Sequence, residues 1–326
     1  MKPHLLAALV LALSIPARAD GVALRKLDIE GFAKPVLVAV PNGYTATKSW
    51  GLVLVLHGTG MNGAHMADAF RDALGEVASA GYLVAFPSSN HPAWSAAGMA
   101  DADKSRELAL LRKAVETIRR DWKIDERCVH GYGFSCGTVA LALALGFRTE
   151  WDGLPMRSFC GNSGGLAGTV APAKAARAKE TAVWILNGEA DPAHADVSRN
   201  IHQAFKLGGY DSRYTVAWGI DHGFPLAPVH EMLEWWRTLD GDKLAHHPAV
   251  KKAPAGYEVP MVPAGSLAAR AGLRVGDRLM SADGNPLNTT EDVSRALTDR
   301  KAGDRVTLTV TRGRTPLRVV LTFPGP

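Results

Sequence analysis

The chain has 326 residues, of which 47% are hydrophobic and 21% are charged, and its formal net charge is +5. This composition is that of a folded globular protein and excludes a disordered or fibrous one. The basic residues are scattered and form no stripe with interleaved aromatic side chains, so we expect no nucleic-acid partner.

The first residues have the pattern of an export signal. Lys2 precedes an apolar run over residues 5–13, and Ala17-Arg18-Ala19 matches the small-x-small rule of a signal peptidase site. The run is too short to span a membrane as a mature helix, and no later stretch is long and apolar enough. We therefore expect residues 1–19 to be a signal peptide, which makes the mature chain periplasmic or secreted. An uncleaved N-terminal anchor is the alternative.

Predicted strands and helices alternate through the first two thirds of the chain. Residues 22–40 form two alternating runs separated by Gly31, which predicts an antiparallel hairpin. Further strands, several of them continuous apolar runs typical of burial on both faces, are predicted at 52–56, 82–87, 128–134, 156–160, 182–186 and 213–217. Helices are predicted up to about residue 78 and at 104–122, 138–145, 196–207 and 229–239. The alternation predicts an α/β fold, a mostly parallel sheet with helices on both faces.

A serine lies between one predicted strand and the helix that follows it, in Gly133-Phe134-Ser135-Cys136-Gly137. In the G-x-S-x-G pattern, the glycines let strand and helix approach at a sharp turn that exposes the serine. A chain with 33 glycines matches this pattern by chance fairly often. The interpretation therefore depends on the partners that the rest of the chain supplies.

A serine nucleophile needs a base, a group that orients the base, and donors for the developing oxyanion. His222 follows the last strand of this region and Asp191 follows the strand before it, at the sheet edge where ligands bind. The order Ser135, Asp191, His222 is that of α/β-hydrolases, and we predict a catalytic triad. Asp191 is preferred because it closes its strand-end loop. The rival acids are Glu189, Asp196 and Asp221.

Two backbone N–H groups are predicted to form the oxyanion hole. The first belongs to Cys136, because it begins a helix, and the second to Thr59 in the strand-end loop His57-Gly58-Thr59-Gly60. Trp94 lies in another strand-end loop and is predicted to line the substrate pocket. Ordinary packing is the alternative for Trp94.

The three cysteines suggest one disulfide in an oxidising compartment. Cys136 and Cys160 fall near the same end of the sheet, whereas Cys128 begins its strand at the opposite end. We therefore expect a Cys136–Cys160 disulfide, with three buried reduced thiols as the alternative. The chain has no C-x-x-C pair, and we expect neither a metal nor a cofactor.

Four segments of the region 50–239 together resemble α/β-hydrolase esterases, in particular the secreted feruloyl-esterase and polyhydroxybutyrate-depolymerase-like group. They are Leu54-Val55-Leu56-His57-Gly58, Gly133-Phe134-Ser135-Cys136-Gly137, Leu186-Asn187-Gly188-Glu189-Ala190-Asp191-Pro192 and Asp221-His222-Gly223-Phe224-Pro225. The resemblance implies that Ser135, Asp191 and His222 hydrolyse an ester through an acyl-enzyme. Cys136 departs from the many relatives that have a small residue such as alanine there. A PDZ-assisted peptidase and a catalytically silent binding protein are the alternatives.

The pattern breaks at residues 242–256, which are rich in Lys, His, Pro and Ala and are typical of a linker. We expect it to join a catalytic domain at 20–241 to a second domain at 257–326. The segment 262–279, with a tight turn at Gly276-Asp277, resembles a bacterial PDZ domain.

The likeness to a PDZ domain continues through a helix predicted near 290–300 and strands predicted at 305–311 and 317–323. PDZ domains bind a peptide C-terminus as an added strand, so the resemblance implies a peptide or protein partner. No carboxylate-binding loop is recognisable before Tyr257. A domain that serves only for packing is the alternative.

Overall fold

A computed structural model describes most of the chain. The described residues are 21–94, 99–144, 156–164, 180–225 and 227–324. The predicted signal peptide at 1–19 lies outside them. Among the described residues, no helix has the length and apolar character needed to cross a membrane.

The larger domain is built on one eight-stranded sheet with the strand order β1-β2-β4-β3-β5-β6-β7-β8. The strands are β1 (Val22–Leu27), β2 (Val36–Pro41), β3 (Trp50–Leu56), β4 (Tyr82–Phe86), β5 (Ile124–Phe134), β6 (Ser158–Asn162), β7 (Ala182–Gly188) and β8 (Asp211–Ala217). The predicted hairpin is confirmed by the antiparallel pairing of β1 with β2, and β2 also runs antiparallel to β4. From β4 through β3 to β8 all pairings are parallel, as the alternation of strands and helices predicts.

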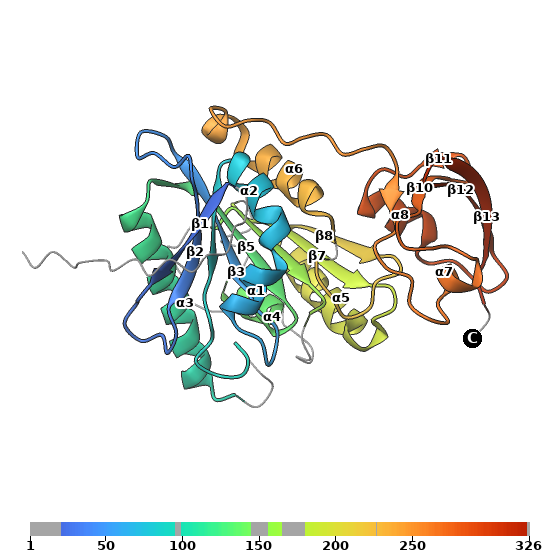
Figure 1. Ribbon diagram of the computed structural model, residues 1–326. Coiled ribbons are helices and arrows are strands. Elements are labelled where there is room, and N and C mark those ends of the chain that lie inside the picture. Colours follow the sequence, from blue (N-terminus) through green and yellow to red (C-terminus); the bar gives the residue numbers. More distant parts are fainter. Residues whose placement is uncertain (1–20, 95–98, 145–155, 165–179, 226, 325–326) are drawn as a thin grey trace, which may run out of the picture.

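Helices cover both faces of this sheet (Figure 1). One face packs against α3 (Asp101–Asp121), α4 (Cys136–Ala142) and α5 (Pro192–Leu207), and the other against α1 (Gly63–Ala69), α2 (Leu74–Ser79) and α6 (Val229–Asp240). Successive side chains of β3 show how one strand serves both faces: Leu54 lies in the first apolar cluster and Val55 in the second. Continuous apolar runs are therefore required in the central strands.

The smaller domain is an antiparallel five-stranded sheet with two short helices and a core of its own. Its elements are β9 (Tyr257–Glu258), α7 (Leu267–Arg270), β10 (Arg278–Ala282), β11 (Asn285–Pro286), α8 (Thr290–Leu297), β12 (Arg305–Arg312) and β13 (Thr315–Thr322). Thr289 and Asp292 form a capping box that begins α8. The connection between the domains begins with a short 3-10 turn, Gly241–Leu244, in which Leu244 is fully buried against the larger domain.

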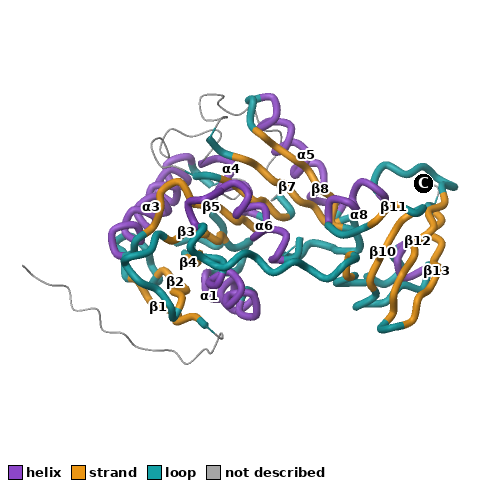
Figure 2. Tube along the Cα trace, turned by 90° about the horizontal axis from the view of Figure 1, so that it is seen from above, coloured by secondary structure: helices purple, strands orange, loops and turns teal. Residues whose placement is uncertain are grey.

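The two domains meet where α8 lies against β8, the edge strand of the large sheet (Figure 2). The backbone N–H of Val216 in β8 donates to the Ser294 hydroxyl at 2.9 Å. Arg213 and Glu291 form an ion pair at 3.4 Å. Trp218, directly after β8, is 3% exposed and packs in the core of the smaller domain. The smaller domain thus covers an edge that would otherwise present unpaired backbone groups.

A buried carboxylate also joins the domains. Glu231 in α6 accepts hydrogen bonds from the Thr290 N–H at 3.0 Å and from the Thr290 hydroxyl at 3.2 Å. Burial raises the pKa of Glu231 from 4.5 to about 7, although the hydrogen bonds from Thr290 act in the opposite direction. Folding thus favours the protonated form of this carboxyl.

We predict that Glu231→Gln reduces the pH dependence of stability. A carboxyl whose pKa is raised by folding stabilises the folded state below its unfolded pKa, and this contribution is lost as the pH rises through the folded pKa. Thermal unfolding at pH 4.5 and pH 8 should therefore show the Tm of the variant rising relative to wild type with increasing pH. Glu234→Gln, at an exposed position of the same helix, is the control. An equal Tm difference at both pH values would contradict the assignment.

Candidate active site

Ser135 lies at the turn between β5 and α4 with φ of 52° and ψ of −117°. A non-glycine residue pays strain energy in this left-handed region. The flanking glycines allow the turn because added side chains would collide with backbone. A Cβ on Gly133 would lie 2.6 Å from the Thr138 nitrogen, and one on Gly137 would lie 2.5 Å from the Leu56 oxygen. The structure therefore has the strand-turn-helix geometry that the G-x-S-x-G pattern predicts.

The structure brings the three predicted triad residues together. His222 Nε2 lies 3.2 Å from Ser135 Oγ, and His222 Nδ1 lies 2.8 Å from Asp191 Oδ2. Ser135 follows β5, Asp191 follows β7 and His222 follows β8. Ser135 is 8% and Asp191 4% exposed, whereas the His222 side chain is 34% exposed. Of the rival acids, Asp196 instead pairs with Arg199.

A second histidine, which the sequence analysis missed, contacts the same carboxylate. This residue is His194. Its Nδ1 lies 2.7 Å from Asp191 Oδ1, and its ring stacks on that of His222 with centroids 3.9 Å apart. Burial would raise the pKa of Asp191, but the hydrogen bonds from His194 and His222 outweigh it and hold the pKa below its ordinary value. The carboxylate therefore stays charged beside His222.

A sequence signal for His194 exists but depends on where α5 begins. The sequence predicts that α5 begins at residue 196, whereas it begins at Pro192. Proline is favourable at the first position of a helix. In a helix that begins there, His194 lies three residues after Asp191 and one turn away.

Judged by distance alone, the side chains of Asp191, His194 and His222 could hold a metal ion. One ligand atom each from Asp191, His194 and His222 lies within 4.8 Å of the others. However, the hydrogen bonds among these residues use both carboxylate oxygens and both Nδ1 atoms, and His222 Nε2 faces Ser135. These side chains therefore already have hydrogen-bond partners in one another and in Ser135.

The loop after β3 is held against the nucleophile turn by His57. This residue is fully buried, its Nδ1 lies 2.8 Å from the Gly58 oxygen, and its Nε2 accepts the Ser89 N–H at 3.0 Å. Burial lowers the pKa of His57, so the ring is neutral with its proton on Nδ1. A Cβ on Gly58 would lie 2.8 Å from the Phe134 ring. The loop therefore packs directly on the residue before Ser135.

Trp94 supports this loop and does not face open space. It is 1% exposed, and its ring centroid lies 5.1 Å from that of His57. A side chain with so little accessible surface offers no wall to a ligand in this structure. Its position matches the packing alternative.

The predicted Cys136–Cys160 disulfide is wrong, since Cys128, Cys136 and Cys160 are all free and buried. Cys160 is the central residue of β6, opposite Tyr132 of β5, and it lies on the other face of the sheet from Cys136. Cys136 packs in the apolar cluster beneath α3, α4 and α5, whereas Cys160 packs in the cluster on the other face, with Trp184. The central sheet separates the two sulfur atoms.

Solved structures resemble the larger domain. An esterase from Pseudomonas putida ECU1011 matches with a TM-score of 0.51 and 12% identity, over 71% of this chain and 85% of its own. The larger domain has the α/β-hydrolase fold. A double mutant of the esterase rPPE matches with a TM-score of 0.50 and 12% identity, over 72% and 86%. A ferulic acid esterase from Anaeromyces mucronatus matches with a TM-score of 0.46 and 12% identity, over 63% and 85%.

Residues 259–312 match the family model of the PDZ domain. The expected PDZ fold of the C-terminal region is thereby confirmed, and the chain combines an α/β-hydrolase fold with a PDZ domain. The comparison with curated proteins found no match.

We predict that Gly137→Ala destabilises the nucleophile turn. The new Cβ would meet the Leu56 oxygen at 2.5 Å, and forced overpacking costs roughly 1–3 kcal/mol. Chemical denaturation of both proteins measures the difference. Gly43→Ala is the matched control, because nothing lies within 4 Å of a Cβ there. Equal unfolding free energies for the two variants would show that the turn does not need the glycine.

Proposed function

We propose that this protein is a serine hydrolase that cleaves carboxylic esters through an acyl-enzyme on Ser135. The observation that carries the proposal is the continuous hydrogen-bonded path from Asp191 through His222 to Ser135, at a strained strand-to-helix turn. This is the arrangement that activates a serine hydroxyl at neutral pH. The α/β-hydrolase fold supports it by placing all three residues at the carboxyl edge of the sheet.

In the first half of the reaction, Ser135 Oγ attacks the ester carbonyl carbon while His222 Nε2 takes the hydroxyl proton. Asp191 keeps the Nδ1 proton of His222 in place and stabilises the imidazolium that forms. The tetrahedral intermediate collapses, the bond to the alcohol oxygen breaks, and His222 gives its proton to the departing alcohol. Water then attacks the acyl-enzyme with the same proton transfers, which releases the acid and restores Ser135.

The oxyanion of both intermediates is proposed to bind the backbone N–H groups of Thr59 and Cys136. The Cys136 N–H is at the first residue of α4, where the helix dipole favours negative charge. The loop of Thr59 is held beside it: the Cys136 thiol donates to the His57 carbonyl at 3.5 Å. This pairing of two neighbouring segments supports a preformed oxyanion site.

Export and a peptide partner belong to the same proposal. The pattern of residues 1–19 supports a signal peptide and hence a periplasmic or secreted enzyme. The PDZ fold supports binding of a peptide by strand addition. A PDZ-assisted peptidase would use the same triad, so the choice of substrate separates it from an esterase.

We predict that an alkyl fluorophosphonate labels the wild-type chain and not Ser135→Ala. The variant should hydrolyse p-nitrophenyl acetate about 10⁴-fold or more slowly, because it lacks the nucleophile. Ser163→Ala, which changes another buried serine with positive φ, should keep the label. Labelling of Ser135→Ala would refute the assigned nucleophile. An unlabelled wild type would favour a silent binding protein. Cleavage of peptides but not of esters by the wild type would favour a peptidase.

We predict that His194→Phe lowers kcat by about ten-fold or more, because a hydrogen bond to a charged group contributes roughly 1.5–3 kcal/mol. The phenyl ring can still stack on His222 but cannot donate to Asp191. His194→Gln, which keeps a donor, should recover part of the loss. His65→Phe, at an exposed position, is the control. Full activity of His194→Phe would mean that His194 does not position the triad.

A further inference from the structure

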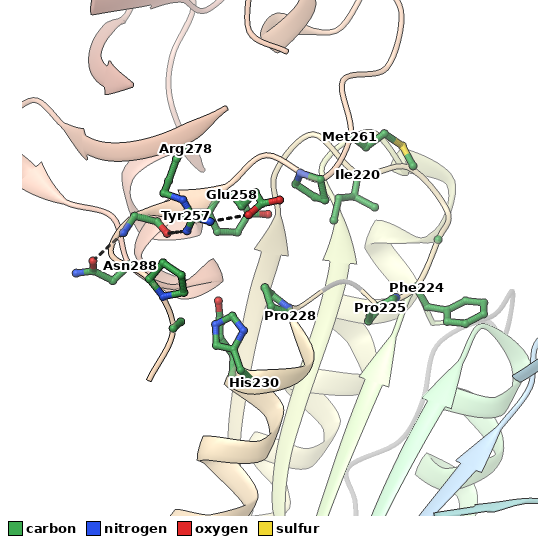
Figure 3. Close-up of a pocket in the computed structure, with 16 residues that line it drawn as sticks. Ile220, Phe224, Pro225, Pro228, His230, Tyr257, Glu258, Met261, Arg278 and Asn288 are labelled. Atoms are coloured by element: carbon green, nitrogen blue, oxygen red, sulfur yellow. Dashed lines mark hydrogen bonds and ion pairs between the residues drawn. The ribbon is translucent and has the colours of Figure 1, made fainter. Parts of the chain in front are cut away.

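A cavity of about 610 Å³ lies between the two domains, beside the loop that carries His222 (Figure 3). The larger domain contributes the residues on either side of His222, among them Ile220, Gly223 and Phe224. The PDZ domain contributes residues of β9 and the segment after it, including Tyr257 and Met261. Neither domain alone would form this cavity.

The lining is mainly apolar and includes an exposed methionine. Met261 is 38% exposed, and it lines the cavity together with Ile220, Pro225 and Pro228. An apolar concavity of this size, with few polar groups, is the usual form of a small-molecule site. The lining therefore favours an alkyl or aryl group as the occupant.

Besides His230, the ionisable side chains of the lining are Arg278, Glu258 and Glu231, and these three have protein partners. Arg278 forms an ion pair with Glu258 at 2.6 Å and donates to the Gly256 oxygen at 3.1 Å. Glu231 accepts the hydrogen bonds from Thr290. A peptide C-terminus, the other candidate occupant, needs donors for its carboxylate, and the Arg278 guanidinium, the strongest cation of the lining, is paired. This difference favours an uncharged ligand.

One wall of the cavity lies close to the proposed catalytic residues, because Gly223 and Phe224, the two residues after His222, line it. The ring of Phe224, in the cavity wall, lies 4.5 Å from that of Phe134, and the Phe134 ring lies 5.1 Å from that of His222. Phe134 directly precedes Ser135. The Phe224 ring therefore lies between the cavity and the nucleophile turn.

The PDZ domain also touches the turn that leads to His222. A Cβ on Gly219 would lie 3.1 Å from the Met261 carbonyl oxygen. The segment that exposes the Met261 side chain is thus held by its backbone against the catalytic loop. This contact fixes the PDZ wall of the cavity relative to the triad.

We propose that the interdomain cavity binds the alkyl or aryl part of the ester that Ser135 attacks, so that the PDZ domain forms one wall of the substrate site. The inference rests on the proposed esterase function. It assigns Met261 a role in substrate selectivity and gives the PDZ domain a function that does not require a peptide.

Met261→Trp in the full chain tests the proposal, because an indole would fill much of the space beside Ile220. We expect the ratio of kcat/KM for long-chain to short-chain esters to fall by about ten-fold or more. The ratio is measured in two series: p-nitrophenyl decanoate against acetate, and decyl acetate against ethyl acetate. Val320→Trp is the matched control, since Val320 is 37% exposed in β13 and is not part of the lining. An unchanged ratio in both series, or an equal change in the control, would overturn the proposal.

Binding of the neutral fluorophore N-phenyl-1-naphthylamine to Ser135→Ala provides a readout that needs no catalysis. We expect fluorescence enhancement that Met261→Trp, added to Ser135→Ala, weakens by ten-fold or more in Kd. If Met261-dependent binding of the fluorophore is found but the wild type hydrolyses no ester, the proposed function is refuted and the cavity remains an apolar binding site. Absence of Met261-dependent binding would overturn the cavity assignment. Displacement of the fluorophore by an apolar peptide with a free C-terminus, but not by its amide, would also overturn it in favour of a peptide site.

Discussion

The close approach of β5 and α4 around Ser135 is the constraint on which the rest of the site depends. The serine can adopt a left-handed backbone only because Gly133 and Gly137 leave room for the facing backbone. Packing of α4 on the sheet maintains this strained turn, since all seven residues of the helix are buried. The serine hydroxyl thereby lies 3.2 Å from His222 Nε2, and the start of the helix is the proposed donor for the oxyanion.

The strand β8 connects this turn to the second domain. Its end leads to His222, its edge receives α8, and Trp218, directly after it, lies in the PDZ core. The geometry of the loop that carries His222 and the position of the PDZ domain therefore depend on the same few residues. Under the proposal above, a second domain joined in this way is part of the substrate environment. The interdomain cavity follows from this arrangement, because it forms where the loop after His222 faces Met261.

Three features of the structure differ from what the sequence predicts, each for a physical reason. Strand-end positions place Cys136 and Cys160 towards the same end of the sheet, but the face on which a side chain lies depends on the local register and on the helix entry. His194 was missed because helix boundaries are weak in sequence, and a shift of four residues hid its relation to Asp191. The position of Trp94 in a strand-end loop predicts a wall of the substrate pocket, but its ring packs on His57.

The sequence by itself determined the order of the strands and helices, the two-domain organisation, the nucleophile turn and the candidate triad. These features depend on local patterns: apolar runs, glycines at a fixed spacing, and polar residues at strand ends. Only the tertiary structure decided which faces the cysteines occupy, that His194 joins Asp191, and that the PDZ domain packs beside His222. Those relations join residues distant in sequence or on different faces, and their distances result from packing, on which local patterns carry no information.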